Sequence, residues 1–474
     1  MARHQLSKST YIRSLQCQKS LYLHKKRPFL RDKMLASQLA KFRRGTAVGK
    51  VARDLFPGGI DMTPKSPSQY QIKRSETLQA MADPQISVIY EAVFQYNEVL
   101  IMLDILVREA DQWRAIEVKS SRGLSETYRE DAYLQYYVLK GNQVAMANFE
   151  LMYINDNYIL NGELNLRELF ISESVMQEAE AHLTQTASKI SLAKETLELN
   201  KSPEIKIGTQ CQKPYSCDFL GHCWKNIPKN SLLYIAAIPA DKRFELFHNG
   251  IHQVDQLAEN QITPLIREQD KALQKQSFTI NNEKFLQLSA GFNKQKLAFI
   301  KVLYNQPAIP VLQHTKAYSP YFLAISVVIT DGLKQELHSW DCSENHDEWQ
   351  SGFDFLASLS PKADVFISFK DSFLNPLIQS YLSGLKSVKI IDLWEFLKDS
   401  DFYVPLINTE LQLDTICSFL LDKFTPLKDE AWLLKDLLED PAKSREMVIL
   451  RLQAYASSIM ALANFMSNKI RTAD

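Results

Sequence analysis

The sequence contains little glycine and cysteine, and neither sign of charge is in excess. Only 14 of its 474 residues are glycine and 6 are cysteine. Without low-complexity tracts, this composition is that of a soluble globular protein rather than a fibrous or disordered chain. The 55 basic residues equal the 55 acidic ones, which argues against a wholly cationic nucleic-acid binder. A chain of this length exceeds one ordinary core, so we expect two or three domains.

Long apolar runs are also absent. No run approaches the ~20 residues that a helix needs to span a bilayer, so we expect no membrane partner. The N-terminal residues are basic and polar, without the apolar segment of a secretory signal. We therefore expect a cytoplasmic protein.

Charge is distributed unevenly along the chain. The first 53 residues contain fourteen Lys or Arg and a single acid, Asp32. Such a segment suits a phosphate backbone, because each neutralised phosphate releases condensed counterions. The alternative is a solvated helical face with no ligand.

Apolar periodicity predicts an α/β chain. Residues 9–53 are expected to be helical, with a turn near Pro28. An antiparallel meander of three strands, a helix and a fourth strand should follow at 86–96, 99–107, 113–118, 126–140 and 145–154. Further strands that alternate with helices are expected at 297–304, 322–329, 365–369 and 389–393. The predicted domains are residues 1–228, a helical connector at 229–285, and an α/β domain at 286–474.

Three charged residues stand where strands are expected. Asp104 interrupts an apolar run, where an aspartate is costly unless it binds something. Glu117 and Lys119 are two apart on the next strand, so their side chains share a face. Two carboxylates can hold Mg²⁺ or Mn²⁺ for phosphodiester hydrolysis, and a lysine can orient the nucleophile or stabilise charge on the phosphate.

A Glu-x-Lys triplet alone is most often a surface ion pair. Here it follows Asp104 and precedes a helix that carries Gln135. This ordered set resembles the PD-(D/E)XK nucleases, in particular the RecB-like branch with its restriction-endonuclease-like core. The resemblance implies that Asp104 and Glu117 bind metal and that Lys119 assists catalysis. It also implies that Gln135 contacts DNA or positions the lysine.

The match to RecB-like nucleases has two departures. Glycine stands within residues 44–49, where those nucleases usually carry a histidine ligand, and Leu139 stands where a tyrosine commonly follows the glutamine. Glu91, on the adjacent predicted strand, has two interpretations. It is either an additional catalytic-site ligand or a structural partner for Lys119 or an arginine.

The cysteines divide into an isolated pair, Cys342 and Cys417, and a group that suggests a metal centre. A cytoplasmic chain should not use them as disulfides. Three of the group recur at six-residue steps in one loop, and a fourth lies near the N-terminus: Cys211, Cys217, Cys223 and Cys17. Zinc prefers tighter spacing, with His222 as a competing ligand, whereas four thiolates suit a 4Fe–4S cluster. Spacing alone leaves both open.

One cysteine before the nuclease core and three after it resemble the iron–sulfur RecB-like nucleases, such as the CRISPR-associated adaptation nucleases and the AddB repair subunit. Over about residues 6–228 the chain is similar to a bacterial family that joins this module to an RNase H-like domain. The segments that carry this similarity are 44–49, 55–59, 117–121 and 211–224. The resemblance implies a 4Fe–4S cluster on the four cysteines that staples the nuclease domain.

In that family the second domain resembles a DEDD-type 3′–5′ exonuclease, whose acids hold two metals. Here Lys301 and Leu303 occupy the places of the first two acids, and residues 455–460 lack the last. Asp392 survives. The resemblance implies a degenerate RNase H-like domain with a scaffold or DNA-binding role. The alternative is an unrelated α/β domain.

The function expected from these patterns is that of an exonuclease-like, divalent-metal-dependent deoxyribonuclease with a structural 4Fe–4S cluster. Its partners would be single-stranded DNA or duplex ends, and proteins of a repair or defence assembly. Two alternatives are a catalytically decayed nucleic-acid-binding or scaffold protein and a zinc-stapled interaction module.

Overall fold

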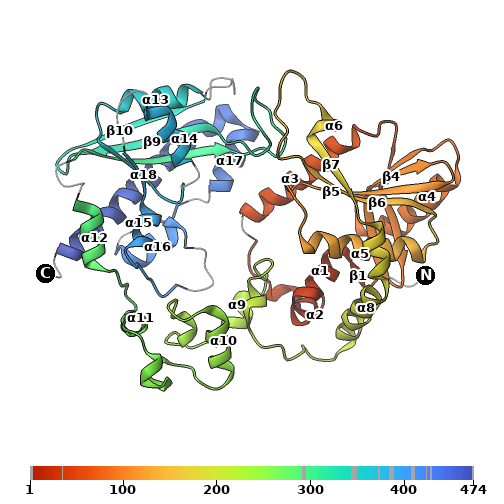
Figure 1. Ribbon diagram of the computed structural model, residues 1–474, viewed down its shortest axis with the longest axis horizontal. Coiled ribbons are helices and arrows are strands. Elements are labelled where there is room, and N and C mark those ends of the chain that lie inside the picture. The colour runs from red at the N-terminus through yellow and green to blue at the C-terminus, as the bar shows by residue number, and fades with distance from the viewer. Residues whose placement is uncertain are drawn as a thin grey trace. The chain divides into compact units, whose positions relative to one another are not determined.

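The computed structural model is α/β and divides into two compact units, each with a mixed sheet (Figure 1). The first unit comprises residues 1–225 and 307–319, and the second comprises 226–306 and 320–474. Residues 307–319 were expected in the C-terminal domain, and the predicted connector forms part of the second unit. The residues that the structure describes are 4–34, 36–290, 295–342, 350–371, 374–383, 389–406, 411–422, 424–427 and 430–471.

The sheet of the first unit has the order β2-β3-β4-β5-β6-β7. These strands span Ile60–Asp61, Val88–Tyr96, Val99–Glu109, Gln112–Lys119, Met146–Ile154 and Phe170–Ser174. The predicted meander is confirmed, because β4 pairs antiparallel with both β3 and β5. Its first turn has positive φ at Asn97 and Glu98 (44° and 57°), as a two-residue type I′ hairpin requires. Helix α5 (Glu126–Gly141) then leads to β6, which is parallel to β5.

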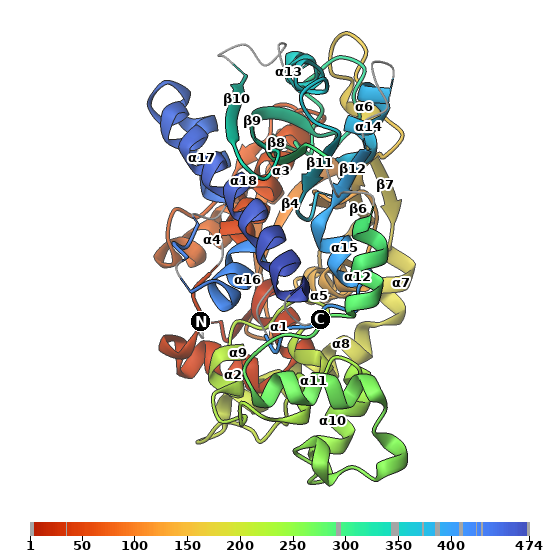
Figure 2. The ribbon, with the colours of Figure 1, turned by 90° about the vertical axis from the view of Figure 1, so that its left-hand side faces the viewer.

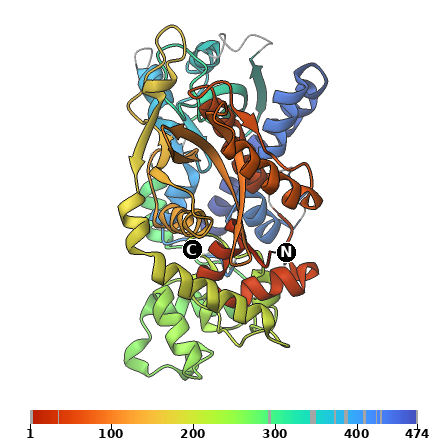
Figure 3. The ribbon, with the colours of Figure 1, turned by 90° about the vertical axis from the view of Figure 1, so that its right-hand side faces the viewer.

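Helices lie on both faces of this sheet (Figure 3). One face packs on α1 (Lys8–Gln16), α5, α7 (Met176–Ala181) and α8 (Leu183–Glu198). The other face packs on α3 (Ala36–Arg53) and on Ala308 and Ala317, which explains why 307–319 belongs here. The remaining helices are α2 (Gln18–Lys26), α4 (Tyr70–Ala82), α6 (Leu166–Leu169) and α9 (Leu220–Trp224).

A seventh strand is too short to be predicted from periodicity. Strand β1 (Leu6–Ser7) pairs in parallel with Val99 and Leu100 of β4. It lies beside the half of β4 that β5 does not reach, since the β4–β5 ladder runs only between Ile105 and Glu109 on β4. This pairing brings the start of α1 to the middle of the sheet.

The sheet of the second unit has the order β10-β9-β8-β11-β12. In chain order, strands β8 to β12 span Leu297–Asn305, Tyr321–Thr330, Gln335–Asp341, Val365–Ser368 and Lys389–Asp392. Strand β9 is antiparallel to both β8 and β10, whereas β11 is parallel to β8 and to β12. One face of this sheet packs on α13 (Ser351–Leu359) and α14 (Asn375–Ser383).

The long helix α18 (Pro441–Arg471) packs across β8, β9 and β10 (Figure 2). The sequence predicted no membrane-spanning segment, yet within α18 the stretch Lys443–Ile470 is long and apolar enough for one by length and composition. The contacts of α18 with β8, β9 and β10 are those of a helix that packs on the core of a folded unit. The other helices of this unit are α10 (Ala240–His248), α11 (Pro264–Gln274), α12 (Asn282–Ser289), α15 (Leu393–Asp399), α16 (Leu413–Leu420) and α17 (Glu430–Glu439).

Candidate active site

The site begins where β4 and β5 separate. Their ladder ends at the pair Ile105–Ile116, one residue short of Asp104 and Glu117. Beyond that point a side chain replaces the backbone partner, because Oδ2 of Asp104 accepts a hydrogen bond from the amide of Val118 at 2.7 Å. Burial and the neighbouring charge of Glu117 raise the pKa of Asp104 to about 7. Asp104, the charged residue within the apolar run, thus lies at the fork, the point where β4 and β5 separate.

Glu117 is buried, with 3% of its surface exposed. Its Oε1 accepts hydrogen bonds from Nζ of Lys119 at 2.9 Å and from Nζ of Lys8 at 2.6 Å. Burial alone raises the pKa of Glu117, but the two ammonium groups outweigh burial and hold it at about 2. Its Oε2 has no hydrogen-bond partner among the described residues. An unpartnered buried carboxylate oxygen is costly, so this atom is available to accept a hydrogen bond or to bind a cation.

Lys119 is held between two acids. Its Nζ donates to Oδ2 of Asp131 at 2.6 Å as well as to Glu117. Burial lowers the pKa of Lys119, but the charges and hydrogen bonds of Asp131 and Glu117 raise it by more than burial lowers it. The net shift is therefore upward. The lysine therefore stays an ammonium group at neutral pH. The sequence analysis did not identify Asp131, although it lies four residues before Gln135 on the same face of α5.

Gln135 is fully buried, and neither of its amide atoms has a hydrogen-bond partner among the described residues. A buried side chain has no exposed surface to offer a DNA strand. In this structure Asp131, one turn earlier on α5, positions the lysine. The roles predicted for Gln135 therefore have no contact in the structure to support them.

Glu91 pairs with an arginine, one of the two interpretations that the sequence left open. It lies between the paired residues Tyr90 and Ala92 of β3 with a φ of 52°. Its Oε1 is 2.7 Å from Nη2 of Arg53 on α3. Burial raises the pKa of Glu91, Arg53 lowers it, and the nearby charge of Glu117 raises it again, with a net upward shift. Glu91 is therefore held by Arg53, and it does not form with Asp104 and Glu117 a three-acid group arranged for one metal ion among the described residues.

Helix α3 carries the stretch in which RecB-like nucleases have a histidine ligand. Gly45 and Gly49 lie on this helix with open space where a side chain would begin. Arg53 is one turn beyond Gly49 and reaches the site instead, also contacting Asp61 at 2.9 Å. The helix therefore supplies a cation, Arg53, to Glu91.

Two carboxylates of this site, Asp104 and Glu117, are candidate ligands for a hard divalent cation. No group of three or more His, Cys, Asp or Glu residues in the described ranges is arranged to hold a single metal ion. The donor chemistry nevertheless fits, because Asp104 and Glu117 offer the oxygen ligands that Mg²⁺ and Mn²⁺ prefer. The unpartnered Oε2 of Glu117 and the raised pKa of Asp104 are both costs that a bound cation would relieve.

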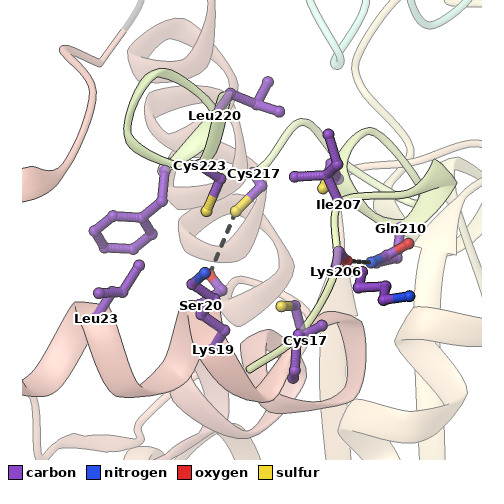
Figure 4. A pocket seen from close by; sticks show the side chains of 13 residues that line it. Cys17, Lys19, Ser20, Leu23, Lys206, Ile207, Gln210, Cys217, Leu220 and Cys223 are labelled. Atoms are coloured by element: carbon purple, nitrogen blue, oxygen red, sulfur yellow. Dashed lines mark hydrogen bonds between the residues drawn. The ribbon is translucent and has the colours of Figure 1, made fainter. Parts of the chain in front are cut away.

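A second centre is formed by cysteines. One pocket is lined by Cys17, Cys211, Cys217 and Cys223, together with Ser20 and other residues of α2 and the cysteine loop. Figure 4 shows the sulfur atoms of Cys217 and Cys223 turned toward each other above Ser20, with Cys17 across from them. The competing ligand His222 does not line this pocket. The far N-terminal cysteine and the three loop cysteines therefore meet, as the sequence predicted.

The cysteine pocket is buried enough to disfavour thiolates without a counter-charge. Burial is the main cause of a raised pKa at Cys17, Cys211 and Cys223, the last to about 11, and neighbouring cysteines raise each further. Side chains of α1 hold the loop in place: Nε2 of Gln16 donates to the carbonyl oxygens of Gln210 and Tyr215 at 2.8 and 2.6 Å. Thiols that raise one another's pKa suit a site that a metal or cluster completes.

In the second unit Lys301 occupies a buried position on β8. Its Nζ lies 2.9 Å from Oε1 of Glu430 and 3.5 Å from Oδ2 of Asp371. Asp392 instead caps α15, because its Oδ1 accepts from the amides of Trp394 and Lys370 at 2.9 and 3.0 Å. An ammonium group therefore lies among the carboxylates, and the sequence analysis identified Lys301 but not its partners Asp371 and Glu430.

The first unit thus has two chemically distinct centres, one of carboxylates and ammonium groups and one of thiols. The second unit has a buried lysine–carboxylate cluster. A search with protein-family models and a search of curated proteins both found no match to this chain.

Proposed function

We propose that this protein is a divalent-metal-dependent DNA nuclease of the PD-(D/E)XK type. The convergence of Asp104, Glu117 and Lys119 at the fork between β4 and β5 carries this proposal. The element order supports it too, since a three-stranded meander followed by a helix and a parallel strand is the core arrangement of these nucleases.

Each residue of the site has a role that follows from its environment. Asp104 and Glu117 would hold Mg²⁺ or Mn²⁺, whereas Glu91 is paired with Arg53. A cation bound there supplies Lewis-acid chemistry to a phosphoryl oxygen and to water. Lys119 is kept protonated by Asp131 and Glu117. It therefore acts as a fixed positive charge that stabilises the phosphate, not as a general base.

The cysteine pocket is proposed to hold a structural 4Fe–4S cluster. In a cubane cluster each thiolate ligates a different iron atom, so the four sulfur atoms lie further apart than around one zinc ion. Four cysteines that line one pocket supply the four thiolates that such a cluster needs.

The second unit is proposed to be a degenerate RNase H-like domain with a scaffold or DNA-binding role. Its strand order, with three antiparallel strands and two parallel ones on the far side of β8, is compatible with this proposal. The ammonium group of Lys301 would then stand at the position where DEDD-type exonucleases bind metal ions.

A second candidate function is a decayed nuclease that only binds DNA, and one observation favours it. The ammonium group of Lys8 occupies Oε1 of Glu117, which a cation would otherwise use. A cleavage assay separates the two candidates.

The test uses anaerobically purified protein, end-labelled single-stranded and duplex DNA, and Mn²⁺. Lys119→Ala is expected to lower the cleavage rate by about 10²–10³-fold, the usual effect of removing one group that stabilises transition-state charge. Lys140→Ala is the matched control, because Lys140, on α5, pairs with Glu180 at the surface and not with the site. Absence of Mn²⁺-dependent cleavage by the intact protein would leave the DNA-binding candidate.

Metal affinity should depend on pH through Asp104. Its pKa of about 7 means that a proton must leave before the carboxylate can bind a cation. Affinity for Mn²⁺ is therefore expected to rise about tenfold between about pH 6 and about pH 8. Calorimetric titration of the DNA-free protein measures this, and Asp104→Asn should abolish the pH dependence. An affinity that stays constant across this range would contradict the prediction.

A further inference from the structure

Lys8 reaches the carboxylate site from a part of the chain far from the other residues. It is the first residue of α1 and follows directly on β1, whose pairing with Val99 and Leu100 fixes the direction of the chain. Nζ of Lys8 donates to the carbonyl oxygen of Met102, two residues before Asp104 on β4, at 3.3 Å. The short strand therefore aims this lysine along β4 into the fork.

Within the site Lys8 shares both partners of Lys119. Its Nζ is 2.6 Å from Oε1 of Glu117 and 4.0 Å from Oδ2 of Asp131. Its side chain is 25% exposed, against 13% for Lys119. Two ammonium groups converge on one oxygen of Glu117 while Oε2 remains unpartnered.

Glu117 and Asp131 neutralise the two lysines in this arrangement. A divalent cation at Glu117 adds two positive charges and the ionised carboxylate of Asp104 offsets one of them, so positive charge is left in excess beside Lys8. Like charges this close repel strongly in a buried site, and Lys8 then needs another anion. The anion available in a nuclease reaction is a phosphate of the substrate, which lysine binds well as a point charge.

We propose that Lys8 is a second lysine of the active site. It neutralises Glu117 in the metal-free protein, and it donates to a phosphate oxygen of DNA when a divalent cation is bound. This inference rests on the proposed nuclease function, and it changes the meaning of the Lys8–Glu117 pair from a sign of decay to the resting state of an active site.

The test compares Lys8→Met and Lys8→Arg with the wild-type holoprotein. Lys73→Met is the matched control, because Lys73 has similar exposure and pairs with Glu76 at 2.7 Å outside the site. Three quantities are measured: Mn²⁺ affinity without DNA, affinity for a DNA oligonucleotide in Ca²⁺, and the rate of Mn²⁺-dependent cleavage.

Removing a competing ammonium group should tighten Mn²⁺ binding by Lys8→Met about tenfold. The same variant should bind DNA more weakly in Ca²⁺ and should cleave about 10²-fold more slowly. Lys8→Arg keeps the charge and should recover much of both DNA binding and cleavage. A lysine that served only as the ion-pair partner of Glu117 could tighten metal binding when removed, but it would not weaken DNA binding as well.

Each contrary result has a distinct meaning. Unchanged or weaker Mn²⁺ binding by Lys8→Met, or DNA binding equal to that of Lys73→Met, overturns the role of Lys8. Normal cleavage by Lys8→Met beside an active wild-type protein overturns it as well, but leaves the nuclease function standing. Failure of the wild-type protein to cleave overturns the proposed function, whereas the two binding measurements still decide whether Lys8 exchanges a carboxylate for DNA.

Discussion

Replacing Lys301 with methionine is expected to destabilise the second unit by about 3–5 kcal/mol, the usual cost of removing one partner from a buried ion pair. The lysine is almost fully buried and contacts Glu430 and Asp371 at 2.9 and 3.5 Å. Methionine fills much of the same volume, so the loss is electrostatic rather than a cavity. It leaves two carboxylates near each other without their cation.

The effect of this substitution should depend on pH. Burial raises the pKa of Asp371 to about 7 in the folded chain, although Lys301 lowers it in part. Because the folded chain binds this proton more tightly than the unfolded chain, the stabilisation from Asp371 is complete below about pH 4 and is lost as the pH rises through about 7. Without Lys301 this pKa rises further. Lys301→Met is therefore expected to cost more at about pH 8 than at about pH 5.

Hydrogen exchange of peptides from β8 and β9 measures this stability within the full chain. Lys398→Met is the control, since Lys398 pairs with Glu395 on the surface of α15 and should cost less than about 0.5 kcal/mol. Adding Asp371→Asn and Glu430→Gln to Lys301→Met should restore part of the loss, because no buried charge then lacks a partner. If Lys301→Met is no less stable than Lys398→Met, the cluster does not stabilise the fold.

The predictable part of the first unit is local in sequence. Strand alternation and the turn at Asn97 and Glu98 predicted the meander, and the pairing of β3, β4 and β5 confirms it. Once two strands are known to be neighbours, charged residues on one face must converge, so Asp104, Glu117 and Lys119 could be grouped from the sequence.

The missed residues approach from distant segments. Lys8 directly follows a two-residue strand whose partner lies 93 residues away, and a strand that short has no periodicity to read. Arg53 is the last residue of α3, and it reaches Glu91 from a segment that is distant in the sequence. Asp131 was the exception, because its spacing from Gln135 places both on one face of α5 and could have identified it.

The boundary between the units failed to emerge from the sequence for the same reason. Residues 307–319 follow β8 along the chain, yet they belong to the first unit, where the Tyr318 hydroxyl donates to the carbonyl oxygen of Ser120. Ile159 and Lys316 form an isolated bridge there. Contacts across such separations depend on packing and leave no periodic signal in either segment.

Replacing Cys17 with serine is expected to remove most of the iron from the anaerobically purified protein and to destabilise the first unit by several kcal/mol. Structural metal centres contribute on the order of 10 kcal/mol to the folds that they hold. Of the four cysteines that line the pocket, Cys17 alone comes from the N-terminal segment, and it joins α1 to α2. Its loss would release this segment from the cysteine loop as well as removing a thiolate.

The same substitution should also disturb the carboxylate site, because α1 runs from Lys8 to the residue before Cys17. Iron and sulfide analysis, visible absorbance, thermal unfolding and Mn²⁺ affinity are the measurements. Cys342→Ser is the control, since Cys342 lies outside the pocket, and His222→Ala should keep its iron. Stoichiometric zinc in the wild-type protein, or full iron retention by Cys17→Ser, would contradict the cluster. Loss of iron with unchanged Mn²⁺ affinity would instead show that the two centres are independent, since α1 would then hold Lys8 in place without its anchor at Cys17.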